Sequence, residues 1–132
     1  MKIAIGTDDK RTIRKGHFGE SRYYQVIEIL NAQIVGNDLR KNPYFEDERV
    51  STHHGQADRI INLLGDCNLF MASSFGKRSV QKISSRGVDC ITARIENIDQ
   101  AISSYLDGRV EDFSYYDLNT EDYVRCSQRS YK

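Results

Sequence analysis

Leu69-Phe70-Met71-Ala72 is a short, continuous apolar run in the middle of this 132-residue chain, and it decides the fold. Runs of this kind are typical of strands buried on both faces of a parallel sheet. Before the run, apolar residues recur at helical spacing over 56–64, and Gly65 follows them. After it, the sequence predicts a helix of about ten residues that ends at Gly87. The middle of the chain is therefore predicted to be helix, buried strand, helix.

The alternation of helix and strand continues toward the end of the chain. Val88-Asp89-Cys90-Ile91-Thr92 predicts another short strand. Asn97-Ile98-Asp99-Gln100 has the form of a capping box, which begins a third helix that ends at Gly108. Strands joined by such helices are parallel and have right-handed crossovers. This half of the chain therefore predicts parallel strands with helices packed on the sheet.

The N-terminal part predicts three strands in a row. Lys2 to Gly6 alternates apolar and other residues, and Tyr23 to Leu30 is β-branched and aromatic. Asn31-Ala32 can turn this strand back into an antiparallel one over Gln33 to Leu39. We therefore predict an α/β fold with one mixed sheet, three antiparallel strands first and parallel βαβ crossovers after them. The first strand is expected to lie centrally, beside the strand at Leu69.

The last 24 residues follow the third predicted helix. Two short strands, over 113–118 and 123–126, could form a terminal hairpin. We expect a single α/β domain over 1–108 and a C-terminal extension over 109–132 that packs on it. The tyrosines of this hairpin could equally form a self-association surface, which would make the protein a homo-oligomer.

Composition excludes several classes of protein. The formal net charge is zero, from 19 basic and 19 acidic residues, which disfavours a nucleic-acid-binding protein. No apolar run has the length of a membrane span, and the N-terminus enters a strand pattern without a secretory signal, so we expect a cytoplasmic protein. Cys67, Cys90 and Cys126 are odd in number and widely spaced, which argues against disulfides or structural zinc. We expect Cys67 and Cys90 to be buried.

All three histidines lie in two glycine-flanked loops, at Gly16-His17-Phe18-Gly19 and Thr52-His53-His54-Gly55. Neutral imidazole is the commonest transition-metal ligand and a proton carrier near neutral pH. Chance placement is the alternative to a site. The loop over 8–19 leaves the carboxyl end of the first strand, so we expect it to lie against Ser73-Ser74-Phe75-Gly76, in the crevice where such sheets bind ligands.

An anionic cargo would also require positive charge at this rim. The amino end of the second helix offers free N–H groups and a favourable dipole. Six cations fall in or beside the same loops: Arg11, Arg14, Lys15, Arg49, Lys77 and Arg78. Taken one by one, these cations are better explained as ordinary solvated surface.

Several segments in order resemble the dinitrogenase iron–molybdenum cofactor biosynthesis family, which includes NifX-type carriers and the C-terminal domain of NifB-type proteins. The resemblance covers about residues 1–108. The matching pieces are Lys2-Ile3-Ala4-Ile5-Gly6-Thr7-Asp8, His17-Phe18-Gly19 before Tyr23-Tyr24, His54-Gly55, 72–76, Gly87-Val88 and 101–108. The chain departs from the family where the usual glycine-rich link reads Ser73-Ser74-Phe75-Gly76, and it has no family counterpart over 109–132.

The resemblance implies a ribonuclease-H-like fold and a non-enzymatic carrier of an iron–sulfur or iron–molybdenum-type cluster precursor. Its partners would be proteins that donate or accept the metallocluster. By motif, His17 and His54 would contact the cluster. His53 is a third metal candidate, but it is better explained as a neighbour of His54 than as a ligand. Four other residues are assigned to cofactor binding with His17: Gly19, Ser73, Ser74 and Gly76.

Two other functions remain open from the residues. A domain of the same fold could act only through protein contacts. Asp8 and Asp9, with Glu20 or Glu28, could instead hold Mg²⁺ for phosphodiester hydrolysis. Turn chemistry explains the two aspartates at least as well, and fold alone does not carry function. Cysteine–histidine catalysis is disfavoured because no thiol lies in a site loop.

Overall fold

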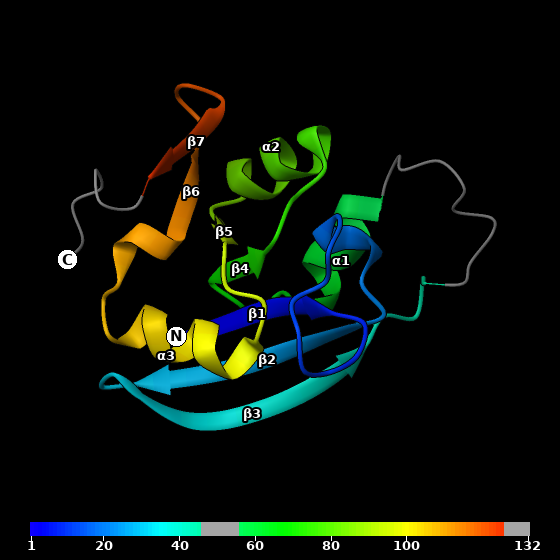
Figure 1. Cartoon of the computed structure of the whole chain (residues 1–132). Helices are drawn as coiled ribbons and strands as arrows, with labels where there is room; N and C mark the ends of the chain where they lie inside the picture. The colour runs from blue at the N-terminus through cyan, green and yellow to red at the C-terminus, as the bar shows by residue number, and fades with distance from the viewer. Residues whose placement is uncertain (46–55, 126–132) are drawn as a thin grey trace.

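The computed structural model describes residues 1–45 and 56–125, and these form an α/β fold with one mixed sheet (Figure 1). The strands run in the order β3-β2-β1-β4-β5-β6-β7. Their bounds are β1 Lys2–Thr7, β2 Tyr23–Leu30, β3 Gln33–Lys41, β4 Leu69–Ala72, β5 Asp89–Ala93, β6 Phe113–Asp117 and β7 Asp122–Arg125. The helices are α1 Gln56–Leu63, α2 Lys77–Ser85 and α3 Ile98–Leu106, with 3-10 turns η1 Phe18–Glu20 and η3 Val110–Asp112. The α/β fold and the mixed sheet are confirmed.

The central position predicted for β1 is confirmed. β1 pairs antiparallel with β2 and parallel with β4, and β4 pairs parallel with β5. Every residue of β4 is buried, as the continuous apolar run predicts for a strand covered on both faces. The carboxyl ends of β1 and β4 therefore lie side by side.

The sheet separates two apolar cores. Ile3 and Ile5 of β1 face α3, whereas Ala4 faces α1 and α2, which lie on the other side (Figure 1). Asp58 of α1 accepts hydrogen bonds from Lys82 of α2 and from Arg86, the C-cap residue of α2, at 2.7 and 2.9 Å, so the two helices on this face are joined. α3 begins as the capping pattern predicts, because the Asn97 side chain accepts a hydrogen bond from the backbone N–H of Gln100.

The β2–β3 hairpin differs from its prediction at one end. The turn residues Asn31 and Ala32 both have positive φ, 54° and 61°, as the two-residue turns that suit a twisted hairpin require. β3, however, continues to Lys41, two residues beyond the predicted end at Leu39. The strand is held there because the Arg40 guanidinium forms two bonds, of 2.6 and 2.7 Å, with the Asp66 carboxylate.

After α3 the chain returns to the sheet. β6 pairs antiparallel with β5, and β7 pairs antiparallel with β6 as a hairpin. Phe113 and Tyr116 of β6 are buried, one in each core. Cys126 lies outside the described residues. Within residues 1–45 and 56–125, no helix is long and apolar enough to cross a membrane.

Candidate functional site

The loop after β1 lies against the loop after β4, as the strand order predicts. His17 forms an isolated parallel bridge with Ser74, and the Phe18 backbone N–H donates to the Ser74 carbonyl at 3.0 Å. The Gly16 N–H donates to the Ser73 hydroxyl at 3.3 Å. The structure thus brings together the sequence-predicted residues His17, Gly19, Ser73, Ser74 and Gly76.

Two buried side chains pin the long loop after β1 to opposite faces of the sheet. Ile13 is 3% exposed in the α3-side core, and its N–H donates to the Glu96 carbonyl at 2.8 Å. Phe18 is 1% exposed and stacks on Phe70, with ring centroids 4.8 Å apart, next to Phe75. A loop anchored in this way holds a fixed shape although it has little regular structure.

Phe18 explains why a phenylalanine separates the histidine and the glycine of the motif. Its carbonyl accepts hydrogen bonds from the Tyr24 hydroxyl and the Ser21 hydroxyl, both at 2.8 Å. Tyr24 and Ser21 are each 0% exposed. The backbone directly after His17 is therefore fixed from below, while His17 itself stays at the surface.

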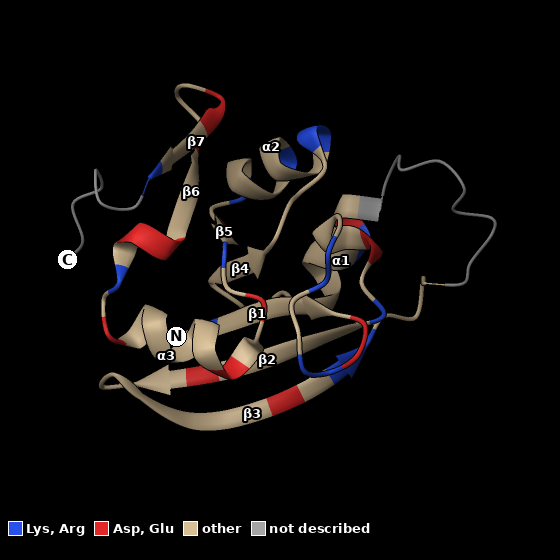
Figure 2. Cartoon of the chain, in the orientation of Figure 1, with Lys and Arg blue, Asp and Glu red and all other residues tan. Residues whose placement is uncertain are grey.

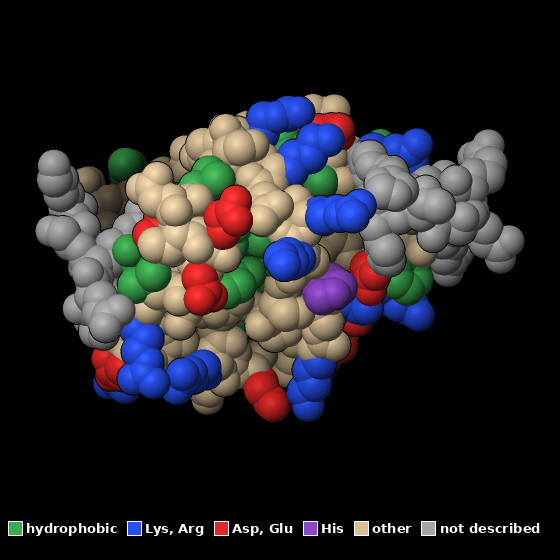
Figure 3. All heavy atoms as spheres, turned by 90° about the horizontal axis from the view of Figure 1, so that it is seen from above, with side chains coloured by type: hydrophobic (Ala, Val, Ile, Leu, Met, Phe, Trp, Pro, Cys, Tyr) green, Lys and Arg blue, Asp and Glu red, His purple; other side chains and the backbone are tan. Residues whose placement is uncertain are grey.

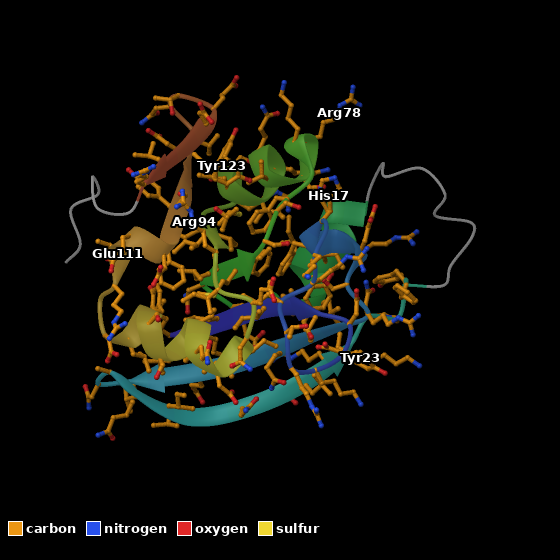
Figure 4. The ribbon with its side chains drawn as sticks, in the orientation of Figure 1. His17, Tyr23, Arg78, Arg94, Glu111 and Tyr123 are labelled. Carbon is orange, nitrogen blue, oxygen red and sulfur yellow. The ribbon has the colours of Figure 1, made fainter. Side chains whose placement is uncertain are left out.

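The His17 imidazole is exposed and lies above η1 (Figures 3 and 4). Its Nδ1 lies 3.3 Å from the Ser74 hydroxyl, an arrangement that orients the ring. Among the described residues no hydrogen bond to Nε2 is found. One ring nitrogen is thus positioned by the protein and the other can bind a ligand.

Gly16 and Gly19, on either side of His17, differ in whether the structure requires a glycine. Gly16 has φ +155°, a conformation that favours glycine, so it sets the direction in which the chain enters His17. A Cβ at Gly19 would meet no heavy atom of the described residues within 4 Å, and its φ is not positive. Gly19 lines a small cavity with Gly76 and with Ala57 of α1. Packing among the described residues therefore does not require glycine at 19.

The amino end of α2 is open. Gly76 is its N-cap and supplies no side chain, and its first turn contains no acidic residue. Lys77 and Arg78 of this turn are exposed, and Figure 4 shows Arg78 at this end of α2. Such an end carries partial positive charge and unpaired N–H groups, which favour an anion.

Fewer free cations lie at this rim than the six that its loops contain in the sequence. Arg14 pairs with Asp8 at 2.5 Å and with Glu20 at 3.5 Å, so its charge is neutralised within the loop. Lys15 lies 3.6 Å from Glu96. Within the described part of the chain, Lys77 and Arg78 form no ion pair, and Arg49 lies outside it. Of the six predicted cations, those in the described part of the chain without an ion pair there are therefore Arg11, Lys77 and Arg78, and the last two lie at the amino end of α2.

His53 and His54 lie outside the described residues. α1 begins at Gln56, and Ala57 in its first turn lines the cavity beside Gly19. Over 1–45 and 56–125, no group of three His, Cys, Asp or Glu side chains could hold a metal ion. His17 is therefore the one described residue of the predicted metal set.

Asp8 and Asp9 serve the loop itself. The Asp9 carboxylate accepts hydrogen bonds from the backbone N–H groups of Thr12 and Arg11, at 2.7 and 2.8 Å, and these hold its pKa well below the usual range. Asp8 is bound by Arg14 and by the Arg22 N–H. Glu28 pairs in register with Lys2, at the opposite end of β1. The predicted alternative of a magnesium site lacks a cluster of carboxylates among the described residues.

The thiols of Cys67 and Cys90 are buried, as predicted. Burial raises the pKa of Cys67 to about 11 and that of Cys90 further. Unfolded thiols ionise near pH 8.5. Above that pH, unfolded thiols lose protons that the folded ones keep. The thiols' contribution to the free energy of unfolding is therefore complete below pH 8.5 and is lost as pH rises toward 11.

We expect the free energy of unfolding, measured with urea, to fall between about pH 8 and 10, where unfolded thiols ionise. Replacing Cys67 and Cys90 by Ala should make the free energy of unfolding less dependent on pH over this range. An unchanged slope in the double variant would contradict the assignment to thiols.

Comparison with known proteins adds to this geometry. Residues 1–108 match the family described as dinitrogenase iron-molybdenum cofactor. The chain belongs to that family. An uncharacterised protein of Methanocaldococcus jannaschii is 25% identical over 115 residues, which cover 86% of this chain and 92% of that protein.

Solved structures of similar fold agree with the architecture. The crystal structure of PH0822 has a TM-score of 0.67 and 24% identity, over 82% of this chain and 90% of that one. The apo form of the orange protein from Desulfovibrio gigas has a TM-score of 0.63 and 16% identity, over 82% and 88%. At these identities the two structures support the fold of this dinitrogenase iron-molybdenum cofactor family member.

Proposed function

We propose that this family member is a non-enzymatic carrier that binds an iron–sulfur or iron–molybdenum-type cluster precursor during metallocofactor assembly. The observation that supports it most is the exposed His17 imidazole, which Ser74 orients beside the open amino end of α2. Donor and acceptor proteins of the cluster would be its partners. We also interpret the order β3-β2-β1-β4-β5, with β2 antiparallel to its neighbours, as a ribonuclease-H-like arrangement.

The donor set fits a cargo better than a resident metal. A carrier must release its cargo, so few protein ligands and backbone N–H groups are suitable. Imidazole suits iron, and an anionic cluster would lie favourably against the amino end of α2. In this proposal His17 supplies one ligand and His54 a second, while Gly19, Ser73, Ser74 and Gly76 line the cargo.

Anaerobic reconstitution with iron and sulfide, followed by absorption spectroscopy, tests the proposal. We expect charge-transfer bands in the wild type and their loss in His17→Ala and in His54→Ala. His53→Ala is the matched control, because it removes the neighbouring imidazole, and it should keep the bands.

The alternative is an interaction module of the same fold that binds no metal. A wild type without charge-transfer bands, also when a preformed cluster is supplied, would favour this alternative. Bands that persist in both His17→Ala and His54→Ala would show that the cluster binds elsewhere.

A further inference from the structure

A second pocket lies at the carboxyl end of β3 and is separate from the surface around His17. It is a cavity of about 340 Å³. The described residues that line it are Arg22, Tyr23, Lys41, Asn42, Pro43 and Phe45. Figure 2 shows Lys and Arg residues gathered at this end of β3 and on the neighbouring loops, and Figure 4 shows Tyr23 there.

A buried amide fixes one wall of this pocket. Asn42 is 1% exposed, and its Nδ2 donates to the Ser21 carbonyl at 2.8 Å. Its Oδ1 accepts from the Tyr44 N–H at 3.0 Å, and its backbone N–H donates to the Arg22 carbonyl at 2.9 Å. A buried amide is tolerated because all these bonds are made. They hold the segment 42–45 in place against Arg22.

The pocket combines aromatic rings with cations that have no ion-pair partner among the described residues. The Arg22 guanidinium lies 4.6 Å from the centre of the Phe45 ring, and the Lys10 ammonium lies 4.8 Å from that of Tyr23. Arg22, Lys41 and Lys10 are exposed, and none has an ion pair with another described residue. The nearby carboxylates of Asp8 and Asp9 are already bound by Arg14 and by backbone N–H groups. The described residues that line the pocket therefore include two cations and no acidic side chain.

We propose that this pocket binds a nucleoside monophosphate, with its phosphate on Arg22 and Lys41 and its base against the rings of Tyr23 and Phe45. Guanidinium groups match the geometry of phosphate oxygens, and lysine supplies a point charge. Aromatic faces accept any base by stacking. This site does not depend on the function proposed for His17.

Amide chemical shifts of the full-length protein, titrated separately with AMP, ribose 5-phosphate and inorganic phosphate, test the proposal. We expect saturable shifts at Arg22, Tyr23 and Phe45, with AMP bound more tightly than ribose 5-phosphate. The double variant Arg22→Gln/Lys41→Gln should bind AMP about tenfold or more weakly. Arg125→Gln removes an exposed cation at the other edge of the sheet and should bind as the wild type does.

Phe45→Leu tests recognition of the base separately from recognition of the phosphate. It keeps an apolar side chain, so AMP binding should fall to the level of ribose 5-phosphate. Absence of saturable shifts in the wild type would overturn the site. Equal affinity for AMP and inorganic phosphate would overturn the nucleotide assignment. Equal losses of AMP affinity in Arg22→Gln/Lys41→Gln and in Arg125→Gln would show that AMP binds only by general charge attraction. Thermal unfolding of each variant confirms that it is folded.

Discussion

Replacing Phe18 by Ala is expected to lower the free energy of unfolding by about 3–5 kcal/mol, the usual cost of deleting a buried aromatic ring. Phe18 is 1% exposed, and its ring contacts those of Phe70, Phe75 and Tyr24, with centroids 4.8 to 5.3 Å apart. Urea unfolding followed by circular dichroism measures the loss.

The same variant should weaken cluster binding under conditions where it is still folded. The Phe18 backbone follows His17 directly and is held by the ring below it, so loss of the ring frees the imidazole. Tyr24→Phe is the matched control, because it keeps the ring and removes one hydrogen bond to the Phe18 carbonyl, a change of about 1 kcal/mol. A loss below that of Tyr24→Phe would show that Phe18 does not anchor the loop.

The architecture could be predicted because each element carries its own signal. The continuous apolar run of β4, the positive-φ turn at Asn31-Ala32 and the cap at Asn97 are local, and all three occur as predicted. The extra residues of β3 could not be predicted in this way. Arg40 is held by Asp66, a residue 26 positions away, and pattern alone does not reveal such a pair.

The sequence predicted where the candidate site lies, but not which contacts hold its loop in place. Strand order alone placed the loop after β1 against Ser73 and Ser74. Sequence reasoning missed the anchors Ile13 and Phe18, although two apolar residues in an otherwise polar loop were a visible signal. It also counted Arg14 as a free cation, because its pairing with Asp8 and Glu20 depends on how the loop folds.

Asn42 was missed for a different reason. Next to a proline, as Asn42 is, an asparagine is an ordinary turn residue. Only the structure shows that its side chain is buried and bonded to Ser21 and Tyr44, which gives the neighbouring pocket a fixed wall.

Gly6→Ala is expected to cost about 1–3 kcal/mol, the range for overpacking a filled core. A Cβ at Gly6 would collide with the Ser21 hydroxyl and lie 3.3 Å from the Ser21 Cβ and 3.4 Å from Phe18 Cδ1. Ser21 is 0% exposed, and its hydroxyl donates to the Phe18 carbonyl, so it cannot turn away without losing that bond. The change should therefore lift η1 from β1 and displace His17 with it.

A second glycine of the same region provides the control. Gly19→Ala meets no described atom within 4 Å, so we expect its free energy of unfolding to stay within about 0.5 kcal/mol of the wild type. The double variant Gly6→Ala/Ser21→Gly should recover part of the loss, since contacting residues are energetically coupled. If Gly6→Ala and Gly19→Ala unfold at the same urea concentration, close packing of η1 on β1 does not hold the histidine loop. Recovery of both stability and cluster binding in the double variant would instead show that this contact positions His17.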